Sequence, residues 1–156
     1  MTKVPVSALL ARYLVSADKA SSWLKRSQMR CAKVDLSQTL AADDFDALEN
    51  LTSRFARLAD ILVQKLFRLI DQAELNSAGS VIDVINRAAK RGLVENEAEM
   101  RQIRELRNAI AHDYTEEELV ALFREVRTLT PSLLAVYATT KTYCERRLMA
   151  QPGGHP

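Results

Sequence analysis

Apolar side chains recur at helical spacing along most of the chain. Between about Asp44 and Leu75 they lie three, four or seven positions apart. Such spacings place side chains on one face of an α-helix. The residues that follow this spacing are Phe45, Leu48, Phe55, Leu58, Leu62, Leu66 and Leu69. The pattern predicts a long amphipathic helix, suited to the centre of a helical bundle.

Two further helices are predicted on either side of this one. The first runs from about Ser7 to Cys31, and its apolar stripe consists of Leu10, Leu14, Ala17 and Leu24. The third begins near Ser80 and ends at Gly92. Asp83 stands three positions after Ser80, which gives an approximate capping box, and a glycine often follows the last turn of a helix.

The fourth predicted helix begins near Asn96, with Glu99 in the N3 position. Its inward-facing residues are Met100, Ile103, Leu106 and Ile110. This helix must end near Ala111, because Thr115 and Glu118 form an S/T-x-x-E capping box that starts a new helix. A short connection therefore separates the fourth helix from the fifth.

The fifth helix is predicted from Thr115 onward. Glu116 and Glu117 suit its first turn, because carboxylates are stabilised at the positive end of a helix dipole. Farther along, Thr130 can cap a helix and Pro131 suits a first helical position, so we expect a kink or a split near Pro131. The whole pattern predicts an all-α, up-and-down bundle of about five helices.

Composition agrees with this fold class. The chain has 156 residues, which suits one domain, and we expect it to span residues 1–150. It contains four glycines and four prolines, and half of these eight lie in the last five residues, PGGHP. The body is therefore nearly free of helix breakers, and residues 151–156 are expected to be a disordered tail.

Charge, cysteines and hydropathy narrow the classes of function. The net charge of +2 leaves nucleic-acid binding open. Cys31 and Cys144 form no CxxC pattern and are interpreted as ordinary thiols, with no metal expected. No long apolar span and no signal peptide is seen, which predicts a cytoplasmic protein without a membrane partner. The common nucleotide-binding, zinc-protease and hydrolase motifs are missing too.

The stretch RELRNAIAHDYTEEEL, residues 104–119, gathers the groups with the most chemistry. On one regular helix Arg107 and His112 would point ~140° apart. The helix end near Ala111 removes that restriction, so His112 can turn back toward Arg107 or across to another chain. Arg107 itself falls on the flank of the apolar stripe, where a guanidinium is partly desolvated unless it meets an anion.

Each of these residues also has a structural interpretation. Arg107 can be a boundary arginine whose stem packs while its head snorkels or pairs with a carboxylate. His112 can be a polar residue favoured at a helix terminus, and Tyr114 can pack at the connection. Asn108 and Asp113 can be surface polar groups. The functional interpretation rests on the occurrence of these residues together in one short segment.

The segment RNAIAHDY resembles the R-x4-H-x-Y motif of HEPN-domain proteins, in particular the HepT-like toxins paired with minimal nucleotidyltransferases. Arg107, Asn108, His112 and Tyr114 fit this motif. The five-helix order also looks like HEPN, with the motif near the end of the fourth helix, and the resemblance covers most of the chain. The candidates for a polar partner of the motif on the second helix are Asp60, Asp71 and Glu74.

The resemblance implies a metal-independent endoribonuclease that uses no cofactor. RNA is then cut by attack of its own 2′-hydroxyl on the adjacent phosphate. His112 suits the base or acid role, because histidine titrates near neutral pH. Arg107 would stabilise charge on the phosphorane, and Asn108 would orient His112 or bind substrate. Because one chain supplies one such histidine, a symmetric homodimer is expected.

The resemblance also implies that a partner protein regulates the ribonuclease. In HepT-like toxins a nucleotidyltransferase antitoxin transfers AMP to the motif tyrosine, which makes Tyr114 the expected site of AMPylation. A non-catalytic subunit that binds a nucleotide or a nucleotidyltransferase (a substrate-binding protein) is the alternative, and a purely structural bundle is a third. Basic residues near the end of the first helix either guide RNA or, as we favour, form a solvated face; they are Lys25, Arg26, Arg30 and Lys33.

Overall fold

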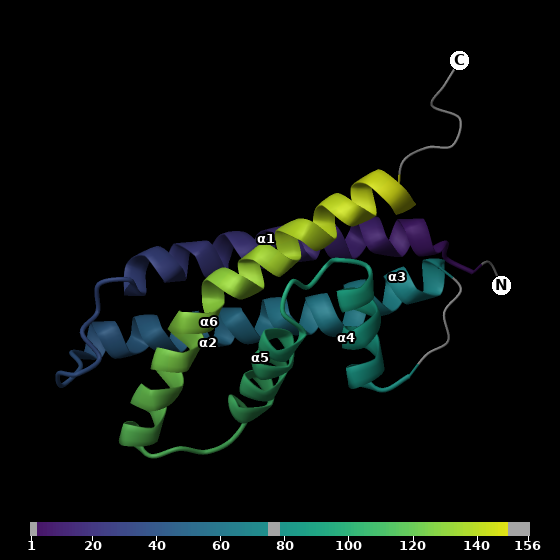
Figure 1. Cartoon of the computed structure of the whole chain (residues 1–156). Coiled ribbons are helices and arrows are strands. Elements are labelled where there is room, and N and C mark those ends of the chain that lie inside the picture. The colour runs from purple at the N-terminus through teal and green to yellow at the C-terminus, as the bar shows by residue number, and fades with distance from the viewer. Residues whose placement is uncertain (1–2, 75–78, 150–156) are drawn as a thin grey trace.

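The computed structural model describes residues 3–74 and 79–149 (Figure 1). These residues form helices and their connections, without a strand among them. The elements are α1 (Val6–Cys31), α2 (Ala42–Asp60), the π-helix η1 (Ile61–Leu66), α3 (Phe67–Ala73), α4 (Val81–Lys90), α5 (Glu97–Ala109), α6 (Glu116–Tyr143) and the π-helix η2 (Cys144–Leu148). The predicted all-α bundle is confirmed.

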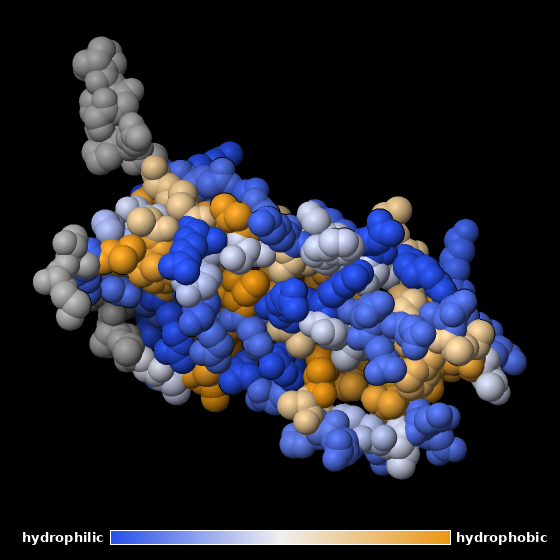
Figure 2. Space-filling model, turned by 180° about the vertical axis from the view of Figure 1, so that it is seen from behind, coloured by the Kyte–Doolittle hydropathy of each residue, from blue (hydrophilic) through white to orange (hydrophobic). Residues whose placement is uncertain are grey.

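The second predicted helix forms the centre of the molecule. The elements α2, η1 and α3 follow one another without a break, so they make one long helical rod. In Figure 1, α1 runs back along this rod, α6 crosses in front of α1, and the short helices α4 and α5 pack on the near side. Figure 2 shows the opposite side, where α1 and α2 lie; hydrophilic side chains cover most of it.

Most of the residues that the periodicity selected lie in the core. The stripe of α1 is buried, and so are all the predicted residues of the central rod except Phe45. Phe45 is half-buried and meets the ring of Phe123 edge to face, with 5.3 Å between ring centroids. Aromatic pairs favour this geometry, so the contact joins α2 to α6 at the margin of the core.

The predicted helix ends are confirmed where side chains cap them. Ser80 and Asp83 form a complete capping box at the start of α4, and Thr115 and Glu118 form another at the start of α6. Asn96 accepts a hydrogen bond from the backbone N–H of Glu99 at the start of α5. Gly92, after α4, has a φ of +79°, which only glycine adopts readily.

Of the two outcomes expected near Pro131, a split is wrong, whereas a kink agrees with the bend of the fifth helix in Figure 1. α6 is one helix from Glu116 to Tyr143, although Figure 1 shows its axis changing direction about midway. Thr130 does not act as a cap, because its hydroxyl donates 2.7 Å to the carbonyl of Val126 one turn earlier. Proline has no N–H for the preceding turn and bends a helix without always ending it.

The π-helix η1 was not predicted. Its N–H groups bond five residues back, as Phe67 does to Leu62. A signal was present in the sequence, because the buried pairs Leu58–Ala59, Leu62–Val63 and Leu66–Phe67 repeat every four residues. In a regular α-helix that repeat would drift ~40° per turn, whereas a wider π turn keeps the pairs facing the core.

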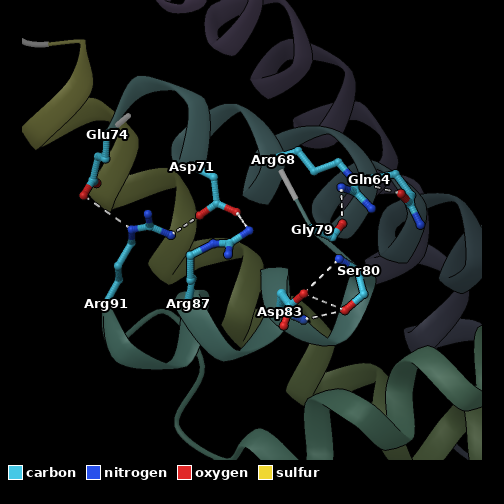
Figure 3. A network of polar contacts seen from close by, with 9 residues as sticks. All are labelled: Gln64, Arg68, Asp71, Glu74, Gly79, Ser80, Asp83, Arg87 and Arg91. Carbon is cyan, nitrogen blue, oxygen red and sulfur yellow. Dashed lines mark hydrogen bonds and ion pairs between the residues drawn. The ribbon is translucent and has the colours of Figure 1, made fainter. Parts of the chain in front are cut away.

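An ion-pair network fastens α4 to α3 (Figure 3). Asp71 is only 3% exposed, and its two oxygens lie 2.6 Å from Arg91 and 2.9 Å from Arg87. Arg91 also reaches Glu74, at 3.4 Å. Asp71 and Glu74 are therefore engaged with arginines at the end of α4, which removes them as partners for Arg107.

Both cysteines agree with the prediction of ordinary thiols. Cys31 and Cys144 are free and buried. Burial raises the pKa of the Cys31 thiol, and it raises the pKa of the Cys144 thiol to about 12, so neither forms a thiolate easily.

Among the helices described, none is long and apolar enough to cross a membrane. The expected tail, residues 151–156, lies outside the described residues.

Candidate functional site

Arg107 finds its anion on the central rod. Its Nε donates to Oδ1 of Asp60 at 2.7 Å, which joins α5 to the last residue of α2. The hydrogen bond to Asp60 raises the pKa of the Arg107 guanidinium above its ordinary value, so the cation is held charged. The predicted need for an anion is confirmed, and Asp60 is the partner among the three candidates.

The ion pair leaves part of the Arg107 guanidinium available. The side chain is 27% exposed, and the side chain of Asp60 is 43% exposed, so the pair lies at the surface of the bundle. Within residues 3–74 and 79–149, the Nε is the only guanidinium nitrogen of Arg107 that is hydrogen-bonded. The two terminal amino groups can therefore donate to a phosphate, for which a guanidinium is well shaped.

A groove of about 530 Å³ opens beside this pair, and we call it the Arg107 groove. It lies between α1, η1 and α5 and is lined by Tyr13, Asp60, Ile61, Gln64, Lys65, Arg104, Arg107, Asn108 and Ala111. Three of these residues are cationic and one is anionic. The Arg107 groove therefore carries an excess of positive charge, although the whole chain is close to neutral.

The π-helix η1 shapes one wall of the Arg107 groove. It begins directly after Asp60 and contributes Ile61, Gln64 and Lys65 to the lining. Single π turns often occur at functional sites, because the wide turn changes the direction of side chains relative to a regular helix. Here the irregular turn lies next to the carboxylate that holds Arg107.

Asn108 is held by its own helix. It is exposed, and its side-chain oxygen accepts a hydrogen bond from Arg104 one turn earlier on α5. No hydrogen bond joins Asn108 to His112 in the part of the chain that the structure describes. Asn108 therefore lines the Arg107 groove together with Arg104, and within one chain it does not orient the histidine.

The connection after α5 is organised around one carbonyl. α5 ends at Ala109, so the helix stops between Arg107 and His112, as predicted. The carbonyl of Ala109 accepts the backbone N–H of His112 at 3.1 Å and the hydroxyl of Tyr114 at 2.6 Å. Tyr114 is half-buried against the core by this contact.

His112 is not among the residues that line the Arg107 groove. The residue is exposed, and its imidazole makes no hydrogen bond within the described residues. Tyr114 does not belong to the lining of the Arg107 groove either. The fold thus brings Arg107, Asp60 and Asn108 together and leaves the imidazole outside.

The fold and the site define an all-α bundle that carries an R-x4-H-x-Y motif at the carboxyl end of α5. The model of one protein family, described as ribonuclease HepT-like, matches residues 9–139. The chain therefore belongs to the ribonuclease HepT-like family, in agreement with the resemblance seen in the motif. Comparisons with curated proteins and with solved structures gave no match.

Proposed function

We propose that the protein is a metal-independent endoribonuclease and the toxin of a toxin–antitoxin pair. The observation that carries the proposal is the Arg107 guanidinium: Asp60 holds it through Nε, and Arg107 lines a groove with excess positive charge. A fixed cation with free donors suits the pentacoordinate phosphorane of RNA cleavage, whose charge develops only in the transition state. Family membership supports the same class of reaction.

In the proposed reaction a base removes the proton of the 2′-hydroxyl, and the 2′-oxygen attacks the adjacent phosphorus. Arg107 stabilises the charge that develops on the non-bridging oxygens. The bond from phosphorus to the 5′-oxygen then breaks, and an acid gives that oxygen a proton. The products are a 2′,3′-cyclic phosphate and a 5′-hydroxyl. His112 supplies the base or the acid.

The proposal includes a homodimer. The reaction needs both a base and an acid, while His112 lies outside the Arg107 groove of its own chain. In a dimer with twofold symmetry, His112 of each copy can approach the Arg107 groove of the other copy. Two histidines and two arginines would then share one cleft between the copies.

A non-catalytic binding subunit is the second candidate. It is favoured by two observations: the exposed imidazole has no hydrogen-bond partner among residues 3–74 and 79–149, and Arg104 engages Asn108. In that case Arg107 would bind a phosphate of a nucleotide and His112 would have no role. Loss of the histidine separates the two candidates.

His112→Ala is expected to lower the rate of RNA cleavage at least about 100-fold while RNA affinity changes less than about twofold, because general acid–base catalysis is lost and the phosphate contacts remain. The measurement compares cleavage of a labelled RNA with binding of the same RNA by the wild-type protein and the variant. A wild-type protein that binds RNA without cutting it would favour the binding subunit instead.

We further propose that a partner nucleotidyltransferase antitoxin inactivates the toxin by AMPylation of Tyr114. The phenolic oxygen would attack the α-phosphorus of ATP, lose its proton and release pyrophosphate. The hydroxyl donates to Ala109 in the free chain, so modification would break this hydrogen bond as well as add a phosphate to the motif. That phosphate would compete with RNA for Arg107.

Co-expression with the partner is expected to raise the intact mass by whole AMP units, and Tyr114→Phe is expected to abolish the rise because the accepting oxygen is gone. Tyr13→Phe is the matched control, since Tyr13 lines the Arg107 groove and should leave the rise unchanged. An unchanged mass increase in Tyr114→Phe would show that another residue is modified.

A further inference from the structure

The only tryptophan of the chain, Trp23, lies on α1 and is 51% exposed. The guanidinium of Arg54, on α2, lies 4.9 Å from the centroid of its ring. Arg54 is fixed there, because its NH1 donates to the hydroxyl of Ser27 at 2.7 Å and to the carbonyl of Trp23 at 3.3 Å. The guanidinium of Arg26 lies 6.0 Å from the same centroid, so two guanidinium groups lie near the half-exposed indole.

A second groove, of about 490 Å³, opens beside this indole between α1 and α2, and we call it the Trp23 groove. Its charged lining residues are Lys19, Arg54 and Arg57, without a carboxylate among them. Asn50 and Ser53 add neutral polar groups. The Trp23 groove is therefore more strongly positive than the Arg107 groove, which includes Asp60.

The two grooves adjoin. Ile61 lines both of them, and α1 passes from Tyr13 in the Arg107 groove to Ser16 and Trp23 in the Trp23 groove. Both grooves are lined by residues of α1 and of the central rod, so they lie along the seam between these elements. One track thus leads from the arginine of the motif to the tryptophan.

An exposed aromatic ring and a row of cations along a groove are the features with which proteins bind single-stranded nucleic acid. Aromatic side chains stack on unpaired bases of any sequence, and cations along the groove meet the phosphates. A second copy of the chain fits this face less well, because twofold symmetry would bring the cations of two Trp23 grooves together. The basic end of α1 contributes less than its sequence indicates, since Arg30 is paired with Asp44 at 2.9 Å.

We propose that the Trp23 groove binds the single-stranded RNA that flanks the scissile bond, with a base stacked on Trp23 and phosphates on Lys19, Arg54 and Arg57. This rests on the proposed ribonuclease function and extends it, because it names the form of the substrate and the side from which it enters. A longer RNA would occupy both grooves, and a dinucleotide only the Arg107 groove.

The test is tryptophan fluorescence of the whole chain titrated with a 2′-O-methyl oligonucleotide of about twelve residues, which cannot be cleaved through its 2′-oxygen. The indole reports on its own surroundings, since Trp23 is the single tryptophan. We expect saturable quenching that weakens as salt is raised, because phosphate contacts release counterions. A spectrum that RNA leaves unchanged would overturn the proposal.

Variants measure the same contact by anisotropy of the labelled oligonucleotide. Trp23→Ala is expected to weaken binding about 5- to 100-fold, the usual loss for one stacked base, and Trp23→Phe to retain most of the affinity. Met29→Ala, an exposed apolar residue elsewhere on α1, is the matched control and should bind like the wild type. Equal affinity for Trp23→Ala and Met29→Ala would refute a stacking role.

Substrate length separates this inference from the ribonuclease proposal. Trp23→Ala should cleave a dinucleotide as the wild type does, and should cleave a twelve-residue RNA with a raised KM and little change in kcat. Equal KM values for the long RNA would overturn the inference while leaving the ribonuclease intact. Quenching by RNA in a wild-type protein that never cleaves RNA would support the binding groove and count against the ribonuclease.

Discussion

Arg107→Ala is expected to lower kcat for RNA cleavage by about 10³- to 10⁵-fold, the range that an arginine stabilising a phosphoryl transition state supplies. The reason lies in the geometry of the pair with Asp60. A guanidinium held through Nε presents its terminal donors without reorganisation, and an alanine removes both donors and the charge. The measurement is single-turnover cleavage at saturating protein, which separates kcat from affinity.

Two variants test whether the loss of cleavage rate results from the loss of the paired guanidinium donors. Arg107→Lys keeps the charge but not the paired donors, so its rate should fall between those of the wild type and Arg107→Ala. Arg101→Ala is the matched control, because Arg101 is an exposed arginine of the same helix that pairs with Glu97 and lines neither groove. If Arg107→Ala cleaves as fast as Arg101→Ala, the assigned role of Arg107 is wrong.

Asp71→Ala is expected to lower the free energy of unfolding by about 3–5 kcal/mol. Asp71 is buried and pairs with Arg87 of α4 and with Arg91, which directly follows α4; their side chains are only 22% and 11% exposed. Without the carboxylate, Arg87 and Arg91 remain in a poorly solvated place with like charges close together. Removal of one partner from a buried ion pair therefore costs far more than the pair itself contributes.

Urea unfolding followed by circular dichroism measures this loss. Glu97→Ala is the control, because the exposed pair of Glu97 with Arg101 should contribute less than about 1 kcal/mol. A destabilisation by Asp71→Ala no larger than that of Glu97→Ala would mean that the network in Figure 3 does not fasten α4 to α3.

The helix ends were predictable because their causes are local in sequence. A capping box needs only a hydroxyl and a carboxylate three residues apart, and both Ser80–Asp83 and Thr115–Glu118 form one. The box formed by Thr115 and Glu118 also predicts that the preceding helix ends between Arg107 and His112. The motif therefore lies at a helix end.

The features that the sequence did not predict depend on contacts between distant elements, or on a choice between two local rules. The choice of Asp60 over Asp71 and Glu74 depends on where the central rod meets α5, which periodicity does not give. Pro131 satisfied the rule for a helix start, yet α6 continues through it, because a proline can bend a helix without ending it. The π turn had a four-residue repeat as its signal, which a search for spacings of three and four cannot distinguish from an α-helix.

The sequence names candidate residues for the site but does not give their geometry. The sequence indicated Arg107, Asn108, His112 and Tyr114, but not which of them share a groove. The pairing of Trp23 with Arg54 could not be predicted either, since 31 positions separate the two residues and their contact depends on how α1 packs against α2.

The most direct test of the account is the chemistry of the RNA ends that the protein leaves in the presence of EDTA. The protein is expressed without any nucleotidyltransferase, and its mass is checked to show that it carries no AMP. We expect a 2′,3′-cyclic phosphate and a 5′-hydroxyl at each cut, both lost in His112→Ala. RNA left intact by the unmodified protein, or ends with a 5′-phosphate, would contradict cleavage by the 2′-hydroxyl at Arg107 and His112.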